Sequence, residues 1–312
     1  MKDIRIATAQ FETRNGDKEY NFSRIEELAG KAADQGAKII CFHELCIPAY
    51  TFLQNLDEEE MFGLAEEVPS GESTSRLIQI AARYDVALLA GLVEKEGDKL
   101  YNTYVCATGE GMVARFRKLH PFISKYLSAG NEYVVFDLFG CKCGILICYD
   151  NNIIENVRAT ALLGAEVLFA PHVTCCTPSS MPGRGWVDRK LWENRHVDPD
   201  GLRWEFDSMK GRGWLMRWLP ARAYDNGIYL VFSNPIGLED VQVKNGNSMI
   251  FDPYGEIIAE CRSFDDEVVV GLCTPEKLEL AGGFRYRKAR RPELYGHILG
   301  KPHDSSTKVD WM

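Results

Sequence analysis

The sequence lacks any apolar run long enough to cross a membrane. No window of the 312 residues approaches the ~18–20 apolar side chains that a transmembrane helix needs. Residues 1–5 also lack the apolar region of a signal peptide and lead directly into a strand-like stretch. We therefore expect a cytoplasmic protein with no membrane partner.

An excess of positive charge is also missing. The 36 Lys and Arg residues are outnumbered by 45 Asp and Glu residues, which gives a net charge of −9. Such a surface repels a phosphate backbone, whose attraction to basic side chains dominates nucleic-acid binding. One short basic run at 285–291 is more typical of a solvated face or an oligomer contact. We expect no nucleic-acid partner.

Cysteine is too sparse for a disulfide scaffold, since only ten cysteines occur in the chain. In a reducing compartment most of them should be buried thiols. Two close pairs, Cys141 with Cys143 and Cys175 with Cys176, could suggest a metal. Neither pair has the CxxC spacing of a zinc site, and no His-x₃-His pair accompanies them. This pattern favours packed thiols over a metal centre.

The amino-acid composition, with 46% hydrophobic and 26% charged residues, is typical of a soluble globular protein. Strands are predicted at 4–10, 38–42, 86–93, 101–107, 112–118, 134–139, 142–148, 167–171, 228–232, 248–251, 256–260 and 267–273. Helices are predicted at 18–35, 73–84 with a Ser or Thr cap, 154–164, and 209–226 with an interruption at Pro220. No linker divides the chain. This order predicts an α/β layered sandwich in a single domain.

Three reactive side chains follow buried strands, at the sheet edge where α/β folds usually place their sites: Glu44, Lys118 and Cys148. A thiol needs a nearby base or cation to act as a nucleophile, and a carboxylate can be that base. A lysine ammonium, aided by backbone N–H groups just after the cysteine, can stabilise an oxyanion. Each residue alone gives weak support for an active site. A lone Cys at the end of a strand is usually a core thiol, and a lone Glu or Lys there is usually a charged loop residue.

The context of these residues is more specific. Three segments resemble the three signature segments of the nitrilase (carbon–nitrogen hydrolase) superfamily, in the same order: FHEL at 42–45, RKLH at 117–120 and GILICYD at 144–150. Further similar stretches lie at 6–10, 100–103, 164–166 and 221–226, so the resemblance covers residues 4–275.

The resemblance implies a four-layer α-β-β-α sandwich over residues 1–275, often dimerised through its outer helices. A homodimer or higher homo-oligomer is therefore expected, with the polar tail 276–312 on a surface or packed on a neighbouring subunit. Glu44 matches the family base, Lys118 the family lysine and Cys148 the family nucleophile. The backbone N–H of Tyr149 is expected to contribute to the oxyanion site. No metal and no organic cofactor are implied.

The implied activity is hydrolysis of a non-peptide carbon–nitrogen bond. An amide or N-carbamoyl substrate would give an acid plus ammonia or an amine through a Cys148 acyl-enzyme. The run Cys148-Tyr149-Asp150 is closer to amidases and carbamoylases than to true nitrilases, which often have Cys-Trp-Glu. Two alternatives stay open, a nitrilase acting on a nitrile and a catalytically silent binding protein.

Residues 173–208 form a Trp- and Arg-rich insertion that could be a lid over the pocket or a subunit contact. Trp186, Trp192 and Trp204 lie in loop-like sequence, whereas Trp214 and Trp218 are four residues apart and should share a helix face. The residues expected to bind substrate are Tyr50, His172, Thr174 and Trp186.

One departure from the family concerns the lysine. Most members carry a second glutamate shortly after it, but residues 119–131 contain no Asp or Glu. Altered substrate choice or lost activity could follow. Alternatively, since a buried ammonium without a counter-charge is costly, an acid of the insertion could approach Lys118: Asp188, Glu193 or Glu205. If none does, Glu44 must be the only counter-charge.

Overall fold

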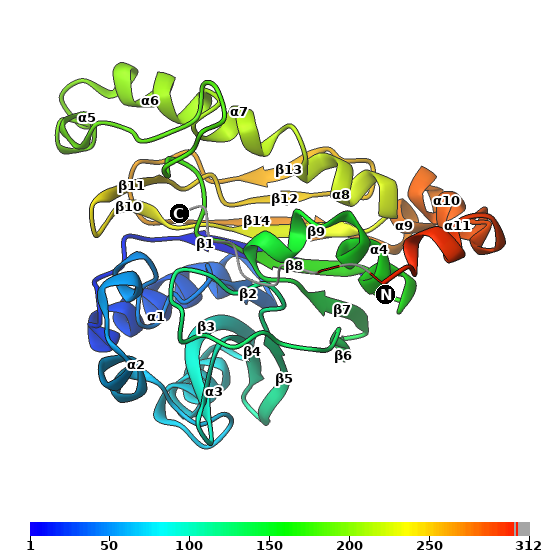
Figure 1. Cartoon of the computed structure of the whole chain (residues 1–312), viewed down its shortest axis with the longest axis horizontal. Coiled ribbons are helices and arrows are strands. Elements are labelled where there is room, and N and C mark those ends of the chain that lie inside the picture. The colour runs from blue at the N-terminus through cyan, green and yellow to red at the C-terminus, as the bar shows by residue number, and fades with distance from the viewer. Residues whose placement is uncertain (303, 305–312) are drawn as a thin grey trace.

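The first and last strands of the sandwich are neighbours in the computed structural model, which describes residues 1–302 and 304 (Figure 1). β1 (Ile4–Gln10) pairs antiparallel with β14 (Glu267–Cys273). The same six-stranded sheet continues, in order, with β2 (Ile39–Cys41), β3 (Ala87–Glu96), β4 (Lys99–Thr108) and β5 (Gly111–Arg117). β1, β2 and β3 are parallel and almost wholly buried, which is why they appear in the sequence as continuous apolar runs.

A second six-stranded sheet faces the first. Its order is β13 (Ile257–Glu260), β12 (Met249–Phe251), β9 (Tyr229–Ser233), β8 (Val167–Pro171), β7 (Cys141–Ile145) and β6 (Val135–Leu138). β7, β8 and β9 are parallel. A separate hairpin that the sequence did not predict joins β10 (Ile236–Glu239) to β11 (Gln242–Asn245).

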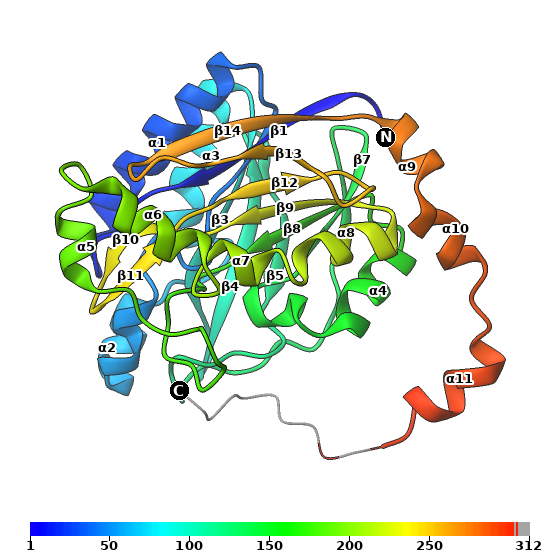
Figure 2. The same ribbon diagram turned by 90° about the horizontal axis from the view of Figure 1, so that it is seen from above.

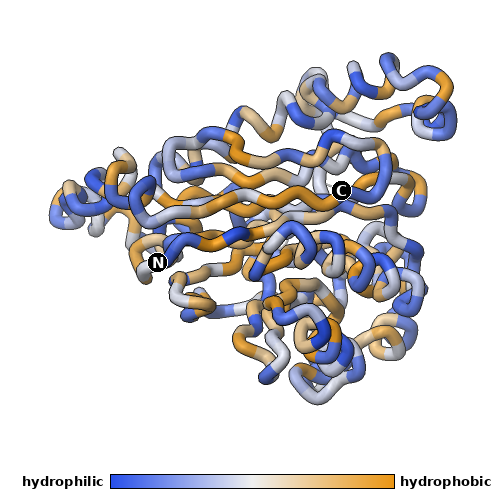
Figure 3. Tube along the Cα trace, turned by 180° about the vertical axis from the view of Figure 1, so that it is seen from behind, coloured by the Kyte–Doolittle hydropathy of each residue, from blue (hydrophilic) through white to orange (hydrophobic). Residues whose placement is uncertain are grey.

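Helices cover the outer faces of both sheets (Figure 2). α1 (Lys18–Asp34) and α3 (Glu72–Tyr84) lie on the first sheet, and α4 (Ile154–Leu162) and α8 (Leu219–Asn226) lie on the second. One apolar core joins side chains of both sheets, including Leu89 and Val231, while another joins the first sheet to α1 and α3. The hydropathy trace shows the same apolar strands beneath more polar outer segments (Figure 3). The predicted α-β-β-α sandwich is confirmed.

The predicted cap of α3 is wrong. Gly71 occupies the N-cap position and makes no side-chain hydrogen bond there. Instead, the Glu66 carboxylate accepts hydrogen bonds from the backbone N–H of Ser73 at 2.7 Å and from its hydroxyl at 2.6 Å. A carboxylate beside a helix N-terminus satisfies the free N–H groups as well as a Ser or Thr cap would.

Short helices replace part of the predicted loop in the insertion. Trp192 lies on α5 (Arg189–Glu193) and Trp204 on α6 (Pro199–Asp207), so the loop assignment of these two tryptophans is wrong. Such helices are too short to show a sequence period and depend on tertiary packing, here of buried Leu202 and Phe206. α7 (Arg212–Leu215) follows, and α8 starts at Leu219 with Pro220 in its first turn, near the predicted interruption.

The remaining elements lie at the edges. They are η1 (Thr51–Asn55), α2 (Glu58–Leu64), η2 (Cys148–Asn151), α9 (Pro275–Leu280), α10 (Gly282–Lys288) and α11 (Pro292–Leu299). α9, α10 and α11 extend along one side of the sandwich (Figure 2), where Tyr286 of α10 contacts Tyr224 of α8. The predicted contact of the tail with a neighbouring subunit stays a prediction, and residues 303 and 305–312 lie outside the described residues. Within the part of the chain described, no helix has the length and apolarity needed to span a bilayer.

Candidate active site

The carboxyl ends of β2, β5 and β7 bring the three predicted side chains together. Glu44 follows β2, Lys118 follows β5, and Cys148 follows β7 at the start of η2. Nζ of Lys118 donates to Oε1 of Glu44 at 2.6 Å, and both side chains are fully buried. The Cys148 thiol is close enough to both for the two charges to change its pKa.

Glu44 is held rigidly by its neighbours. Its Oε1 also accepts a hydrogen bond from Nδ2 of Asn102 at 2.6 Å, and its Oε2 accepts one from the backbone N–H of Val173 at 3.2 Å. The turn after Glu44 passes very close to Gly91 of β3, where a Cβ would lie 2.3 Å from the backbone nitrogen of Leu45. A glycine is therefore needed at position 91 for the carboxylate to reach its place.

Lys118 stays charged although it has no access to solvent. Burial by itself disfavours the ammonium, but Glu44, followed by Cys148 and Asp150, outweighs burial and raises the pKa of Lys118 above its ordinary value. The rings of Phe122 and Tyr50 lie 4.5 Å and 5.6 Å from Nζ and add cation–π attraction. Lys118 is thus a preformed, fixed positive charge beside Cys148.

Cys148 has an unusual backbone, with φ = 48° in the left-handed region. A non-glycine residue there is strained by on the order of 1–3 kcal/mol, and such residues cluster at functional sites. Burial, followed by the Glu44 carboxylate, raises the pKa of the thiol to about 12, although Lys118 acts in the opposite direction. The resting group is therefore a neutral thiol, which needs a base to become a nucleophile.

Asp150 is a site residue to which the sequence analysis gave no role. Its buried carboxylate accepts hydrogen bonds from the backbone N–H groups of Leu119 at 3.1 Å, His120 at 2.9 Å and Ile147 at 3.3 Å. It therefore ties the segment after Lys118 to the segment before Cys148. The signal was present in the GILICYD segment, where Asp150 follows the cysteine by two positions.

The hypothesis of a replacement acid from the insertion is wrong. Asp188 accepts the backbone N–H of Lys190 at the start of α5, Glu193 pairs with Arg189 at 2.7 Å, and Glu205 pairs with Lys210 at 2.6 Å. Among the described residues, Glu44 is the only carboxylate within 4.0 Å of Nζ of Lys118. Glu193 and Glu205 pair with basic side chains close to them in the chain, and Asp188 caps α5, so Glu44 is the direct counter-charge.

A cavity of about 210 Å³ opens beside Cys148. Of the residues expected to bind substrate, Tyr50 and Thr174 line it, and Tyr149 lines it as well. The hydroxyl of Tyr50 is buried and lacks a hydrogen-bond partner among the described residues, so it is available to a substrate. The other lining residues are Thr51, Phe122, Ile123, Asn152, Val173, Thr177, Pro178, Met181, Arg184, Trp214, Gln242 and Lys244.

Two expected substrate-binding residues lie elsewhere. The Trp186 side chain points to solvent with 58% of its surface exposed, and Trp214 from α7 lines the cavity instead. His172 is 1% exposed, does not line the cavity and packs against Trp218 and Phe232, at ring-centroid distances of 5.6 Å and 4.8 Å. Both expectations are corrected by this packing.

The insertion contributes to the cavity through its first part. Thr177, Pro178, Met181 and Arg184 line the cavity, whereas α5 and α6 do not. α5 instead lies against the hairpin of β10 and β11. A lid formed by residues 173–208 remains a prediction, and the first part of the insertion is the segment that would form it.

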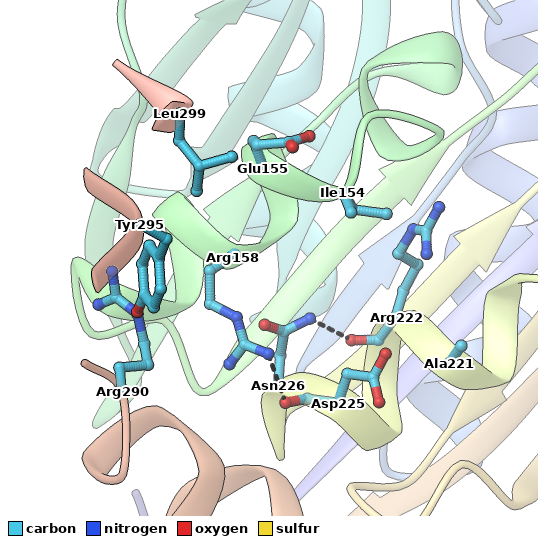
Figure 4. Close-up of a pocket in the computed structure, with 10 residues that line it drawn as sticks. All are labelled: Ile154, Glu155, Arg158, Ala221, Arg222, Asp225, Asn226, Arg290, Tyr295 and Leu299. Carbon is cyan, nitrogen blue, oxygen red and sulfur yellow. Dashed lines mark hydrogen bonds between the residues drawn. The ribbon is translucent and has the colours of Figure 1, made fainter. Parts of the chain in front are cut away.

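A larger hollow, about 370 Å³, lies on the outer surface between α4, α8 and α11 (Figure 4). Arg158 crosses it to donate to the backbone carbonyl of Asp225 at 3.0 Å. Ile154 at its rim is 59% exposed. The residues that line it include no cysteine, so its chemistry does not match that of the Cys148 cavity despite its size.

All ten cysteines lie within the described residues, and all are buried and unpaired by disulfides. The two close pairs are therefore packed thiols, as predicted. Cys175 and Cys176 hydrogen-bond to the backbone carbonyls of Gly211 and Lys210.

Comparison with known proteins agrees with this arrangement. Residues 5–281 match the carbon–nitrogen hydrolase family. A nitrilase of Pyrococcus abyssi is 28% identical over 270 residues, covering 86% of this chain and 88% of that protein. An (R)-stereoselective amidase of a Pseudomonas species is 28% identical over 303 residues and 96% of each chain. An omega-amidase of Xenopus tropicalis is 28% identical over 309 residues, covering 95% of this chain and 98% of that protein.

Solved structures share the fold. An amidase of the nitrilase superfamily from Nesterenkonia sp. AN1 superposes with a TM-score of 0.69 at 23% identity, covering 94% of this chain and 96% of that one. Another structure of that amidase carries the acetamide moiety of fluoroacetamide on its active-site cysteine, with a TM-score of 0.70, 24% identity and coverage of 95% and 97%. At this identity the likeness establishes the fold.

Proposed function

The chain belongs to the carbon–nitrogen hydrolase family, and on that premise we propose that it hydrolyses linear amides or N-carbamoyl compounds through a Cys148 acyl-enzyme. The observation that carries this proposal is that a neutral thiol, which lines the cavity, lies beside a buried carboxylate and a fixed ammonium. Several relatives are amidases by name, which supports an amide over other carbon–nitrogen substrates.

Acylation begins with Glu44 as general base. Because the pKa of Cys148 is about 12, the thiol must lose its proton during attack, and Glu44 is the carboxylate beside it. The sulfur bonds to the substrate carbonyl carbon while the proton passes to Glu44. Glu44 then returns the proton to the substrate nitrogen, the carbon–nitrogen bond breaks, and ammonia or an amine leaves. The product on the enzyme is a thioester.

Lys118 and the backbone N–H of Tyr149 stabilise the oxyanion that develops on the carbonyl oxygen. The ammonium is already in place and desolvated, so its attraction to the new negative charge requires little reorganisation. Loss of one oxyanion donor typically slows turnover ~10²–10³-fold. In the second half of the reaction Glu44 takes a proton from water, the resulting hydroxide attacks the thioester, and the acid leaves as the thiol is restored.

The direct test is ammonia release measured across simple amides, N-carbamoyl amino acids, carbamoyl amines and nitriles. We expect amides or carbamoyl compounds to be turned over and Cys148→Ala to abolish turnover. A small residue at the start of η2 makes only a modest void, so the variant should stay folded. Turnover by Cys148→Ala beyond a trace would refute the nucleophile, and turnover of nitriles alone would favour the nitrilase alternative.

A silent binding protein is distinguished by thiol reactivity. Cys148 lines the cavity, whereas the other nine cysteines do not. If Glu44 activates Cys148, iodoacetamide should label it faster than the others, and Glu44→Gln should remove that advantage. Equal labelling of all ten thiols would favour the silent alternative.

Two further expectations remain proposals. We propose that the chain forms homo-oligomers through its outer helices, where Ile154 of α4 is 59% exposed at the hollow of Figure 4 and Leu163, which directly follows α4, is 55% exposed. Light scattering at several protein concentrations tests this. A cytoplasmic location is the other proposal, which fractionation of cells that produce the protein would test.

A further inference from the structure

The cavity beside Cys148 is lined by two cationic side chains and, within the described residues, by no acidic one. The cations are Lys244 from β11 and Arg184 from the first part of the insertion. The acylation chemistry described above uses neither of them. An unbalanced positive charge in a substrate cavity points to a negatively charged group on the substrate.

Lys244 is the more unusual of the two because it is only 1% exposed. Its Nζ donates to Oε1 of Gln242 at 2.6 Å, a neutral partner that also lines the cavity. No carboxylate of residues 1–302 or 304 lies within 4.0 Å of Nζ. Burial lowers the pKa of Lys244, and the attraction of the Glu239 carboxylate, which acts in the opposite direction, offsets only part of this effect.

No other ionisable group near Lys244 forms a direct ion pair with it among the described residues. Glu239 is the nearby acid, and its two oxygens accept hydrogen bonds from the backbone N–H of Tyr50 at 2.7 Å and the hydroxyl of Thr51 at 2.6 Å. The nearby thiols give no negative charge at neutral pH, because burial raises the pKa of Cys148 and Cys176 to about 12 and that of Cys175 well above its ordinary value.

Arg184 is oriented by an aromatic face and not by an acid. Its guanidinium carbon lies 3.9 Å from the ring centroid of Trp214, which also lines the cavity. Its Nε is buried without a hydrogen-bond partner in the described structure. Burial lowers the pKa of Arg184, yet a guanidinium stays charged at any physiological pH. It therefore has free donors for a planar anion.

We propose that Lys244 and Arg184 bind a carboxylate at the far end of the amide substrate, so that the substrate class is the ω-amides of dicarboxylic acids or the N-carbamoyl amino acids. This inference rests on the proposed amide hydrolysis. A carboxylate would supply the direct ion-pair partner that neither cation has within the described structure. The same cations repel amides that carry an amine, which gives selection against them. The cavity volume of about 210 Å³ suits a short chain between the two ends.

Three matched substrates test the proposal: glutaramate, which is anionic, pentanamide, which is neutral, and 5-aminopentanamide, which is cationic. We expect kcat/KM to fall in that order. Lys244→Met should lower kcat/KM for glutaramate by about 10²-fold, as is typical when one partner of a buried charge pair is removed. The decrease that Lys244→Met causes in kcat/KM for pentanamide should be at least about tenfold smaller. Arg184→Gln should also lower the ratio of kcat/KM for glutaramate to kcat/KM for pentanamide.

Matched controls separate local from general effects. Lys142→Met and Arg189→Gln remove exposed charges that do not line the cavity, and both variants should keep the wild-type kcat/KM for each of the three substrates. If the wild type turns over pentanamide as well as glutaramate, or if Lys244→Met lowers both equally, the carboxylate site is wrong while amide hydrolysis stands.

A binding measurement keeps the two proposals distinguishable. Calorimetry with Cys148→Ala needs no turnover, and it should detect glutaramate binding that weakens about 10²-fold in the Cys148→Ala/Lys244→Met variant. Binding of glutaramate without turnover by the wild type would refute the hydrolase and support the anion site. Absence of selective binding would overturn the anion site.

Discussion

Oδ1 of Asp150 accepts the backbone N–H of His120 at 2.9 Å, so a residue two positions after Cys148 fixes a residue two positions after Lys118. The same oxygen lies 2.9 Å from Nδ1 of His120. His120 and Asp150 are 30 residues apart in the chain, and their contact holds the segments that follow β5 and β7 in one geometry. We infer that Asp150 is a positioning residue.

Asp150→Asn tests this positioning. The amide has one acceptor oxygen where the carboxylate has two, so some of the backbone N–H groups lose their partner. We expect the free energy of unfolding to fall by about 2–3 kcal/mol. Because Lys118 shifts relative to the substrate carbonyl, kcat should fall at least about tenfold with a smaller change in KM. The exposed control Asp137→Asn should change neither quantity, and an unchanged kcat in Asp150→Asn would contradict the positioning role.

Variants of the Glu44–Lys118 pair should affect stability and activity differently. Lys118→Met leaves a buried carboxylate without its cation and should destabilise the protein by about 3–5 kcal/mol. Adding Glu44→Gln removes that uncompensated charge, so the double variant should recover much of the stability while ammonia release stays abolished. Urea unfolding measures the free energy of unfolding of each variant. A double variant no more stable than Lys118→Met would show that the two groups are not coupled.

Acid should destabilise the fold through buried histidines. Burial lowers the pKa of His43 from 6.5 to about 3, and neither ring nitrogen has a hydrogen-bond partner in the described structure. The unfolded chain binds this proton near pH 6.5, whereas the folded chain resists it until about pH 3. Stability therefore falls as the pH decreases through this window, by about 1.4 kcal/mol per pH unit for one such group.

His43→Leu should accordingly reduce the dependence of the unfolding free energy on pH between 6 and 4. The exposed His297→Gln serves as the matched control, since its side chain is open to solvent. An equal pH dependence in the wild type and in His43→Leu would mean that His43 titrates normally in the folded protein.

Substitutions of Trp214 and Trp186 are expected to differ in their effect on catalysis. Trp214 lines the cavity and supports Arg184, so Trp214→Ala should raise KM about tenfold or more for an anionic amide. Trp186 is 58% exposed and should tolerate Ala with a change in KM of less than about twofold. Steady-state kinetics on the two variants decide this, and a larger effect at Trp186 would restore it as a substrate-binding residue.

Much of the fold could be predicted from the sequence because its central strands are buried on both faces. The strands at 4–10 and 167–171 were predicted with the bounds that the structure has, and so was the partly buried edge strand at 267–273. Glu44 and Cys148 could be grouped for the same reason, since each follows such a strand, whereas Lys118 follows the partly buried edge strand β5.

Other site features depend on contacts that no local pattern records. Arg184 and Lys244 lie on a loop and on a short unpredicted hairpin 60 residues apart, and only tertiary packing places them in one cavity. The helices of the insertion are too short for a hydrophobic period. The role of Asp150 depends on its side chain turning back to the end of β5, which neighbouring residues do not reveal.

The central claim is that an amide is cleaved through a thioester on Cys148. The most direct measurement is mass spectrometry of the proteolytic peptides after rapid acid quenching of the enzyme during turnover of an amide. We predict an added mass equal to the substrate less ammonia, found on the peptide that contains Cys148, retained in Cys106→Ala and absent in Cys148→Ala. An acyl group on any other residue, or steady turnover with no acylated Cys148 peptide, would contradict the mechanism.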